Sequence, residues 1–144
     1  MIKLNLPAFD YKLKKVDGKV WIFDGIRKKY VVLTPEEWVR QHVVQYMLNQ
    51  LKYPKSLIKV EASLTYNSLD KRADVVVFDR EGKPWMIVEC KAPDLKLTQV
   101  VAMQVATYNT SLQAPFVVIT NGMLVYCFEI QPEIKSLAEL PVFS

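Results

Sequence analysis

The chain has 144 residues, of which 51% are hydrophobic, so it is long enough and apolar enough to bury the core of one domain. A formal net charge of +4 and a pI near 9.0 favour a polyanionic partner, although ordinary solvated surface charge gives the same balance. No run of about 18 uncharged apolar residues occurs, which argues against a membrane span and predicts a soluble, cytoplasmic protein. We therefore expect a single domain over residues 1–144.

The first predicted elements are a hairpin and a helix. Apolar alternation over 19–23 and 29–33 predicts two strands that are joined by a short loop. Thr34 followed by Glu37 three positions on is a capping-box pattern, and it predicts a helix that runs to about Leu51. This helix has an apolar stripe broad enough to cover a sheet.

The rest of the chain alternates strands and one more helix. A helix is expected from Thr98 to the Ala114-Pro115 stop, with Val101, Val105, Tyr108 and Leu112 on its apolar face. Turns are expected at residues 67–70 and at Asn121-Gly122. The predicted strands cover residues 57–66, 73–78, the apolar run that begins at Trp85, 116–120 and 124–129. The order is β-β-α-β-β-β-α-β-β with a weakly patterned tail, which predicts an α/β fold with a mixed central sheet flanked by helices.

Three residues on neighbouring predicted strands could carry chemistry. Glu89 and Lys91 are two positions apart in a strand, so both point to one face, roughly 6.6 Å apart along the chain, while Cys90 faces the other side. Asp74 begins the adjacent strand, and Mg²⁺ commonly takes one or two carboxylates together with phosphate oxygens. The backbone carbonyl of Cys90 could add a third oxygen, and Lys91 could hold or help deprotonate an attacking water.

A simpler interpretation remains open at this point. Asp74, Glu89 and Lys91 could be surface charges at strand ends that form a weak ion pair. An acidic residue and a lysine at spacing two occur by chance in many proteins. The apolar run before Glu89 and the carboxylate on the neighbouring strand favour a metal site, so the sequence pattern alone supports the two interpretations about equally.

Four segments together resemble the PD-(D/E)XK nuclease superfamily, and more closely the nuclease domain at the N-terminus of type I restriction enzyme R subunits and its stand-alone relatives. The segments, which span most of the chain, are Thr34-Pro35-Glu36-Glu37-Trp38-Val39-Arg40-Gln41, Arg72-Ala73-Asp74-Val75-Val76-Val77, Glu89-Cys90-Lys91-Ala92-Pro93 and Gln104-Val105-Ala106-Thr107-Tyr108-Asn109. The resemblance implies a restriction-endonuclease-like fold, with metal ligands at Asp74 and Glu89 and a catalytic lysine at Lys91.

The resemblance also implies supporting residues. Many members carry a helical glutamate that contributes to the metal site, which here would be Glu37; completing the helix cap is an equally good explanation of that residue. A Gln-x-x-x-Tyr motif falls on Gln104 and Tyr108. Gln104 could reach DNA backbone or orient Lys91, or it could bond a strand carbonyl, whereas Tyr108 is more typical of a core residue with a solvated hydroxyl.

These observations predict a Mg²⁺- or Mn²⁺-dependent endonuclease that hydrolyses DNA, of the restriction-modification type. Lys28, Lys29 and Arg72 lie in basic clusters and are expected to contact DNA. Trp21 is more typical of packing, but stacking on nucleic acid is conceivable beside its basic hairpin. A non-cleaving DNA-binding or assembly module that keeps the fold is the alternative, and a homodimer or larger nuclease assembly is compatible with either.

Overall fold

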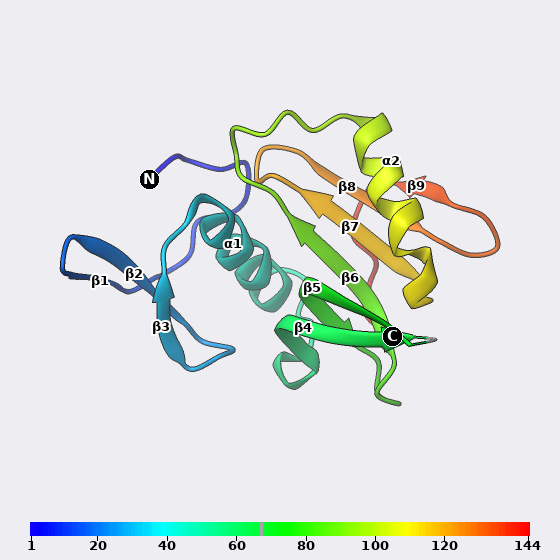
Figure 1. The fold of residues 1–144 in the computed structure, drawn as a ribbon, viewed down its shortest axis with the longest axis horizontal. Helices are drawn as coiled ribbons and strands as arrows, with labels where there is room; N and C mark the ends of the chain where they lie inside the picture. The colour runs from blue at the N-terminus through cyan, green and yellow to red at the C-terminus, as the bar shows by residue number, and fades with distance from the viewer. Residues whose placement is uncertain (67) are drawn as a thin grey trace.

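The computed structural model describes residues 1–66 and 68–144, with the side chains of Tyr66 and Leu69 left out of the description. Within these residues a larger sheet lies between two helices, and a smaller sheet stands at one end (Figure 1). The strands are β1 Leu13–Val16, β2 Lys19–Asp24, β3 Lys29–Val32, β4 Ile58–Tyr66, β5 Leu69–Phe78, β6 Pro84–Cys90, β7 Phe116–Thr120, β8 Val125–Glu129 and β9 Lys135–Leu137. The helices are α1 Pro35–Asn49 and α2 Gln99–Tyr108, with 3₁₀ turns η1 Lys55–Leu57 and η2 Asn109–Leu112.

The larger sheet has the order β4-β5-β6-β7-β8-β9 and is mixed. β6 and β7 are parallel because α2 forms the crossover between them, whereas the other neighbours pair antiparallel. β1, β2 and β3 form a separate antiparallel sheet. Within the described residues, neither helix is long and apolar enough to cross a membrane.

Each helix begins at a threonine cap and covers one face of the larger sheet. Thr34 Oγ1 accepts from the Glu37 N–H at 3.1 Å, and Thr98 Oγ1 accepts from the Val101 N–H at 3.3 Å. α1 packs with Val75, Val77 and Val88, and α2 packs on the opposite face with Val117 and Ile119. The cap threonines expected from the sequence are therefore confirmed.

The predicted nine elements are all present, with bounds within a few residues of the expected ones. Two strands at the ends of the order, β1 and β9, are additional. β1 is exposed along its whole length and β9 has only three residues, so neither carries a buried apolar alternation. Of the predicted turn at residues 67–70, Asn67 lies outside the described residues, and β5 already begins at Leu69.

The predicted apolar face of the second helix is wrong at Val101 and Tyr108, whereas Val105 and Leu112 do pack against the sheet. Ala102 and Ala106 are fully buried against the sheet, whereas Val101 and Tyr108 are 37% and 68% exposed. Small alanine side chains allow the helix to approach the sheet closely, so this side is the one that packs. Tyr108 is thus no core residue; its ring lies 3.8 Å from Lys71 Nζ, a cation–π contact at the surface.

Candidate functional site

Asp74 lies where the pairing of β5 with β6 ends. The register runs from Phe78 with Pro84 to Val75 with Val88. One residue further on, Asp74 Oδ2 accepts from the Cys90 N–H at 2.7 Å, so a side-chain carboxylate takes the donor that a continued ladder would use. Its position is therefore fixed by the backbone of the strand that carries Glu89.

A change of side-chain direction turns Asp74 toward α1. Val75 packs on the α1 side of the sheet, but Ala73, two residues before it, packs on the α2 side. The neighbouring strand β4 is irregular beside Asp74 as well, because Glu61 has a left-handed φ of +53°. A left-handed backbone at a glutamate costs on the order of 1–3 kcal/mol and tends to be kept at functional sites.

Glu89 and Lys91 share a face of β6, as strand alternation predicts. Lys91 Nζ lies 3.4 Å from Glu89 Oε2, with 39% and 22% of the two side chains exposed. Cys90 between them is buried among the residues under α1. The Lys91 N–H donates to the Thr120 carbonyl at 2.8 Å, which continues the parallel pairing with β7 one residue past the strand.

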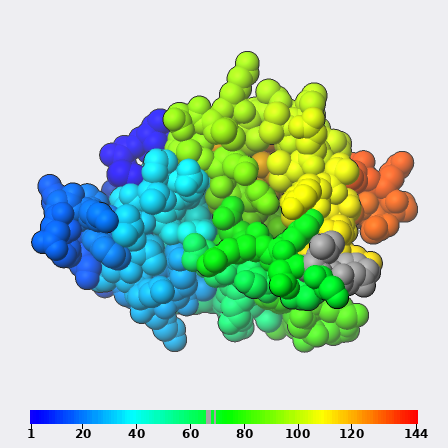
Figure 2. Space-filling model, in the orientation of Figure 1, coloured from blue at the N-terminus to red at the C-terminus, as the bar shows by residue number. Residues whose placement is uncertain are grey.

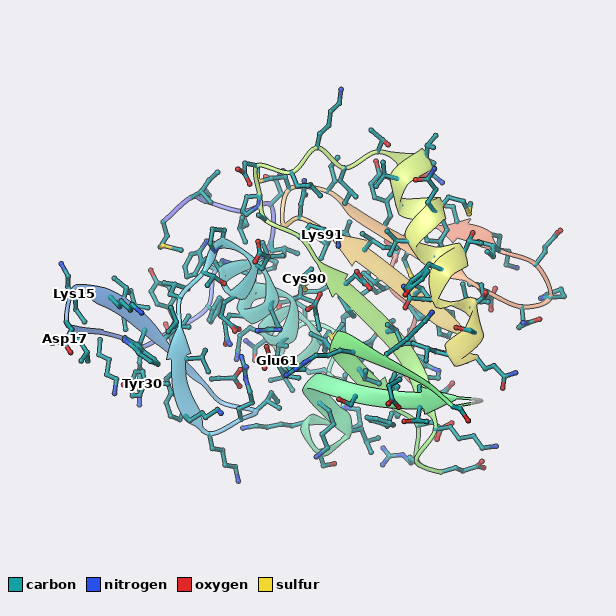
Figure 3. The ribbon with its side chains drawn as sticks, in the orientation of Figure 1. Lys15, Asp17, Tyr30, Glu61, Cys90 and Lys91 are labelled. Atoms are coloured by element: carbon teal, nitrogen blue, oxygen red, sulfur yellow. The ribbon has the colours of Figure 1, made fainter. Side chains whose placement is uncertain are left out.

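These side chains open into one cavity of about 690 Å³ between α1, the middle of β4 and β5 and the end of β6. Figure 3 shows Glu61, Cys90 and Lys91 near one another at this place. The charged lining consists of Glu36, Arg40, Glu61, Arg72, Asp74, Glu89, Lys91 and Asp94. Five of these are carboxylates and three are cations, so the cavity carries an excess of negative charge that suits a cation.

Beside the cavity lies a buried group of five side chains, which we call the Glu37 cluster: Asp24, Arg27, Glu37, Arg40 and Gln41. Glu37 Oε1 accepts from Arg27 at 2.8 Å and from Arg40, and its Oε2 accepts from Gln41 at 2.9 Å. Asp24 Oδ2 accepts from Arg27 at 2.8 Å and from Gln41 at 3.0 Å. The two negative charges of Asp24 and Glu37 are thus neutralised by the two positive charges of Arg27 and Arg40.

Arg40 connects this cluster to the cavity. The same guanidinium that pairs with Glu37 lies 3.5 Å from Glu61 and 3.6 Å from Asp74. Arg27 likewise reaches Glu61 at 3.1 Å. A planar guanidinium with several fixed donors can contact three carboxylates at once, which a lysine ammonium cannot match in geometry.

The pKa values of Glu37 and Asp24 are shifted in the opposite direction to that of Asp74. Burial favours a raised pKa at Glu37, but hydrogen bonds from Arg40, Gln41 and Arg27 outweigh it and lower the pKa from its ordinary 4.5. The pKa of Asp24 is lowered in the same way, burial being outweighed by its bonds to Arg27 and Gln41. Burial raises the pKa of Asp74, since the Cys90 N–H and the Arg40 charge compensate only in part and Glu89 adds repulsion.

A divalent metal such as Mg²⁺ fits the oxygen donors of the cavity. Among the described residues no set of three or more His, Cys, Asp or Glu side chains is arranged to hold a metal. Mg²⁺ does not require such a set, because it keeps several waters and is bound by one or two carboxylates plus substrate phosphate. Asp74 and Glu89, with the Cys90 carbonyl between Glu89 and Lys91, offer that smaller set.

The structure separates the residues predicted from sequence into two groups. Asp74, Glu89, Cys90, Lys91 and Arg72 line the cavity. The others lie elsewhere in the described part of the chain: Glu37 in its buried cluster, Gln104 and Tyr108 on α2 with exposed side chains, and Lys28 and Lys29, both exposed, at the end of the β2–β3 turn and the start of β3.

Several residues of the site were not singled out from the sequence. Arg40 is one, although its spacing of three from Glu37 on a helix is the signal of a local ion pair. Glu61, Asp24 and Arg27 gave no such signal, because each joins the site from a distant part of the chain.

Comparisons with known proteins agree with this picture. Residues 35–143 match the family model described as "Type I restriction enzyme R protein N terminus". No curated protein matches the chain. A crystal structure described as a "putative nuclease belonging to DUF820", from Anabaena variabilis ATCC 29413, has a TM-score of 0.51 at 15% sequence identity and covers 95% of this chain and 84% of that chain. The fold is therefore the restriction-endonuclease-like α/β fold that the sequence predicts.

Proposed function

Because the chain belongs to the family of type I restriction enzyme R protein N-terminal domains, we propose that it is a metal-dependent nuclease that hydrolyses phosphodiester bonds of DNA. The observation that carries the proposal is the meeting of Asp74, Glu89 and Lys91 in one cavity, one acid from the middle of β5 and an acid and a cation from the end of β6. Metal-assisted hydrolysis of a phosphodiester uses hard oxygen ligands for the metal and a polar group beside the attacking water.

Asp74, Glu89 and the Cys90 carbonyl would hold Mg²⁺ or Mn²⁺. When bound, the ion would neutralise charge on the phosphate and favour deprotonation of the attacking water. The raised pKa of Asp74 supports this role, because a carboxylate that is poorly compensated in the protein alone gains most from a cation. Arg40, at 3.6 Å from Asp74, acts as a positioning residue that keeps this carboxylate turned toward α1.

Lys91 supplies a positive charge beside the proposed metal ligands. Its ammonium group is partly exposed in the cavity and is paired with Glu89 at 3.4 Å. There it can donate to the attacking water or to a phosphate oxygen, and it stabilises the negative charge that develops in the transition state. Arg72, whose side chain lines the cavity and is 69% exposed, would contact the DNA backbone.

The test is cleavage of supercoiled plasmid DNA by the purified protein in Mg²⁺ and in Mn²⁺. Cleavage is expected with metal, and none with EDTA. Lys91→Ala is expected to lower the rate at least about a hundredfold, the scale of a lost general acid or base. Lys96→Ala, which removes an exposed lysine five residues along that does not line the cavity, is the matched control.

Two outcomes would contradict the proposal. Cleavage by Lys91→Ala at the wild-type rate would remove Lys91 from the site. DNA binding that falls steeply with salt, ignores Mg²⁺ and leads to no cleavage of duplex or single-stranded DNA would identify the non-cleaving module instead.

A further inference from the structure

The small sheet of β1, β2 and β3 precedes the part of the chain that matches the family model, which begins at residue 35. In Figure 2 its hairpin, in blue, projects from one end of the molecule. Every residue of β1 is exposed. Because most of this sheet is exposed, it contributes little buried surface to the hydrophobic core. An exposed surface of this kind can serve as a binding surface.

The register shows that the two faces of this sheet differ. One face carries Ile22 and Asp24, both buried, together with Val31, and packs toward α1. The other face, here called the outer face, carries Lys14 beside Trp21 and Phe23 beside Tyr30. By the same alternation Lys19 and Lys12 lie on it, since Lys19 pairs with Val16 and the Lys12 carbonyl accepts from the Phe23 N–H.

The outer face combines positive charge with aromatic rings. Phe23 is 37% exposed, and Tyr30 meets it edge-on at 5.3 Å between ring centroids. Lys14 Nζ lies 4.2 Å from the centre of the Tyr30 ring. Lys12, Lys14 and Lys19 are exposed, whereas Asp24, the acidic residue within these strands, is buried on the opposite face. Figure 3 shows Tyr30 on the small sheet, well away from Lys91.

We propose that the outer face is a binding surface for single-stranded DNA, separate from the cleavage cavity. A base would stack on Phe23, which Tyr30 holds in place, and phosphates would pair with Lys12, Lys14 and Lys19. Exposed aromatic rings favour a single strand over a duplex, because the bases of a duplex are already stacked on each other. The inference extends the proposed function but does not depend on cleavage.

Binding to the two surfaces can be measured separately. Without a divalent ion the cavity presents five carboxylates against three cations, so it repels a polyanion, whereas the outer face keeps its three lysines. We would therefore measure fluorescence anisotropy of a labelled oligothymidylate of about 15 nucleotides in EDTA over a range of salt concentrations.

Charge on the outer face is tested by a triple variant, Lys12→Gln with Lys14→Gln and Lys19→Gln. Its affinity is expected to fall at least about tenfold, and the slope of log affinity against log salt should decrease by about 2, at roughly 0.7 per lost phosphate contact. The control triple, Lys15→Gln with Lys55→Gln and Lys83→Gln, removes the same charge from exposed positions elsewhere. Equal losses in the two triples, or no loss in the first, would overturn the proposal.

Stacking is tested by Phe23→Leu, which keeps an apolar side chain but removes the ring. Its affinity for oligothymidylate should fall about tenfold with the salt slope unchanged. Asp74→Asn should bind as the wild type does in EDTA, whatever its effect on cleavage. Tighter binding of a duplex than of the single strand, unchanged by Phe23→Leu, would contradict the assignment, as would self-association of the wild type that Phe23→Leu abolishes.

Discussion

The Glu37 cluster lies beside Asp74 and Glu89, which we call the Asp74–Glu89 pair, and the carboxylates of the two regions differ in how fully hydrogen bonds and cations compensate them. In the cluster, each carboxylate accepts from at least two side chains, and the pKa values of Asp24 and Glu37 are lowered. In the Asp74–Glu89 pair, Asp74 accepts one backbone N–H, lies 3.6 Å from Arg40 and has a raised pKa. The acids of the cluster are compensated within the protein, whereas the charge of Asp74 is compensated only in part.

This difference distinguishes the two regions in a way that residue type does not. Glu37 and Glu89 are both glutamates in the motifs of the family, but only Glu89 opens into the cavity with Asp74. Arg40 belongs to both regions, because one guanidinium contacts Glu37, Glu61 and Asp74. Glu37 thus positions the Arg40 guanidinium, and this guanidinium in turn contacts Asp74.

The largest effect is expected from Asp74→Asn. The amide is a poor metal ligand, so the rate of DNA cleavage in Mg²⁺ should fall at least about a thousandfold, several kcal/mol of transition-state stabilisation. The free energy of unfolding at pH 7 should not decrease, since the substitution removes a charge that burial disfavours. A urea titration beside the plasmid assay checks both, and a large loss of stability with cleavage retained would reverse the roles of the two regions.

Glu37→Gln should instead destabilise the fold. It removes the charge that balances Arg27 and Arg40, both mostly buried, and should lower the free energy of unfolding by about 3 kcal/mol. Glu36→Gln, at the exposed neighbouring position, is the control and should stay within about 0.5 kcal/mol of the wild type. If Glu37→Gln unfolds like the control but binds Mn²⁺ more weakly, Glu37 is a metal ligand rather than a structural residue.

Arg40→Lys should affect both regions, each more weakly. An ammonium keeps the charge but cannot contact Glu37, Glu61 and Asp74 together, so stability should fall by about 2 kcal/mol. Cleavage should fall about tenfold, as expected for a displaced rather than a deleted ligand. Equal cleavage by Arg40→Lys and wild type, measured under conditions where both are folded, would show that Arg40 does not position Asp74.

Acid should distinguish the two regions by the sign of the effect. Asp24 and Glu37 have lowered pKa values, so they contribute stability above their ordinary values of 3.8 and 4.5, and this is lost as the pH falls through their folded pKa values. Asp74 has a raised pKa, so its protonation offsets part of that loss. The loss of stability in urea below about pH 4.5 should therefore be shallower in Glu37→Gln and steeper in Asp74→Asn.

The shared face of Glu89 and Lys91 could be predicted from the sequence because strand alternation is local. An apolar run ending in Glu89-Cys90-Lys91 places the acid and the lysine on one face, and the Lys91–Glu89 ion pair confirms it. Asp74 on the neighbouring strand followed from the short connection between the two strands. The metal and the reaction remain predictions.

The Glu37 cluster could not be predicted, because its partners are distant in sequence or depend on packing. Asp24 and Arg27 come from the small sheet and Glu61 from β4, where a left-handed backbone turns the chain. For the same reason, the pattern of residues alone provides no basis to place Ala102 and Ala106, rather than Val101, against the sheet. Which side packs depends on how closely the helix approaches the sheet, and hydrophobicity alone favours the larger residues.

The central claim is that a divalent ion binds between Asp74 and Glu89, outside the Glu37 cluster. Calorimetric titration with Mn²⁺ of the wild type, Glu89→Gln and the control Glu133→Gln, an exposed position on the loop before β9, tests it most directly. The wild type and the control should bind with equal affinity, and Glu89→Gln at least about tenfold more weakly. Unchanged Mn²⁺ binding by Glu89→Gln would contradict the account.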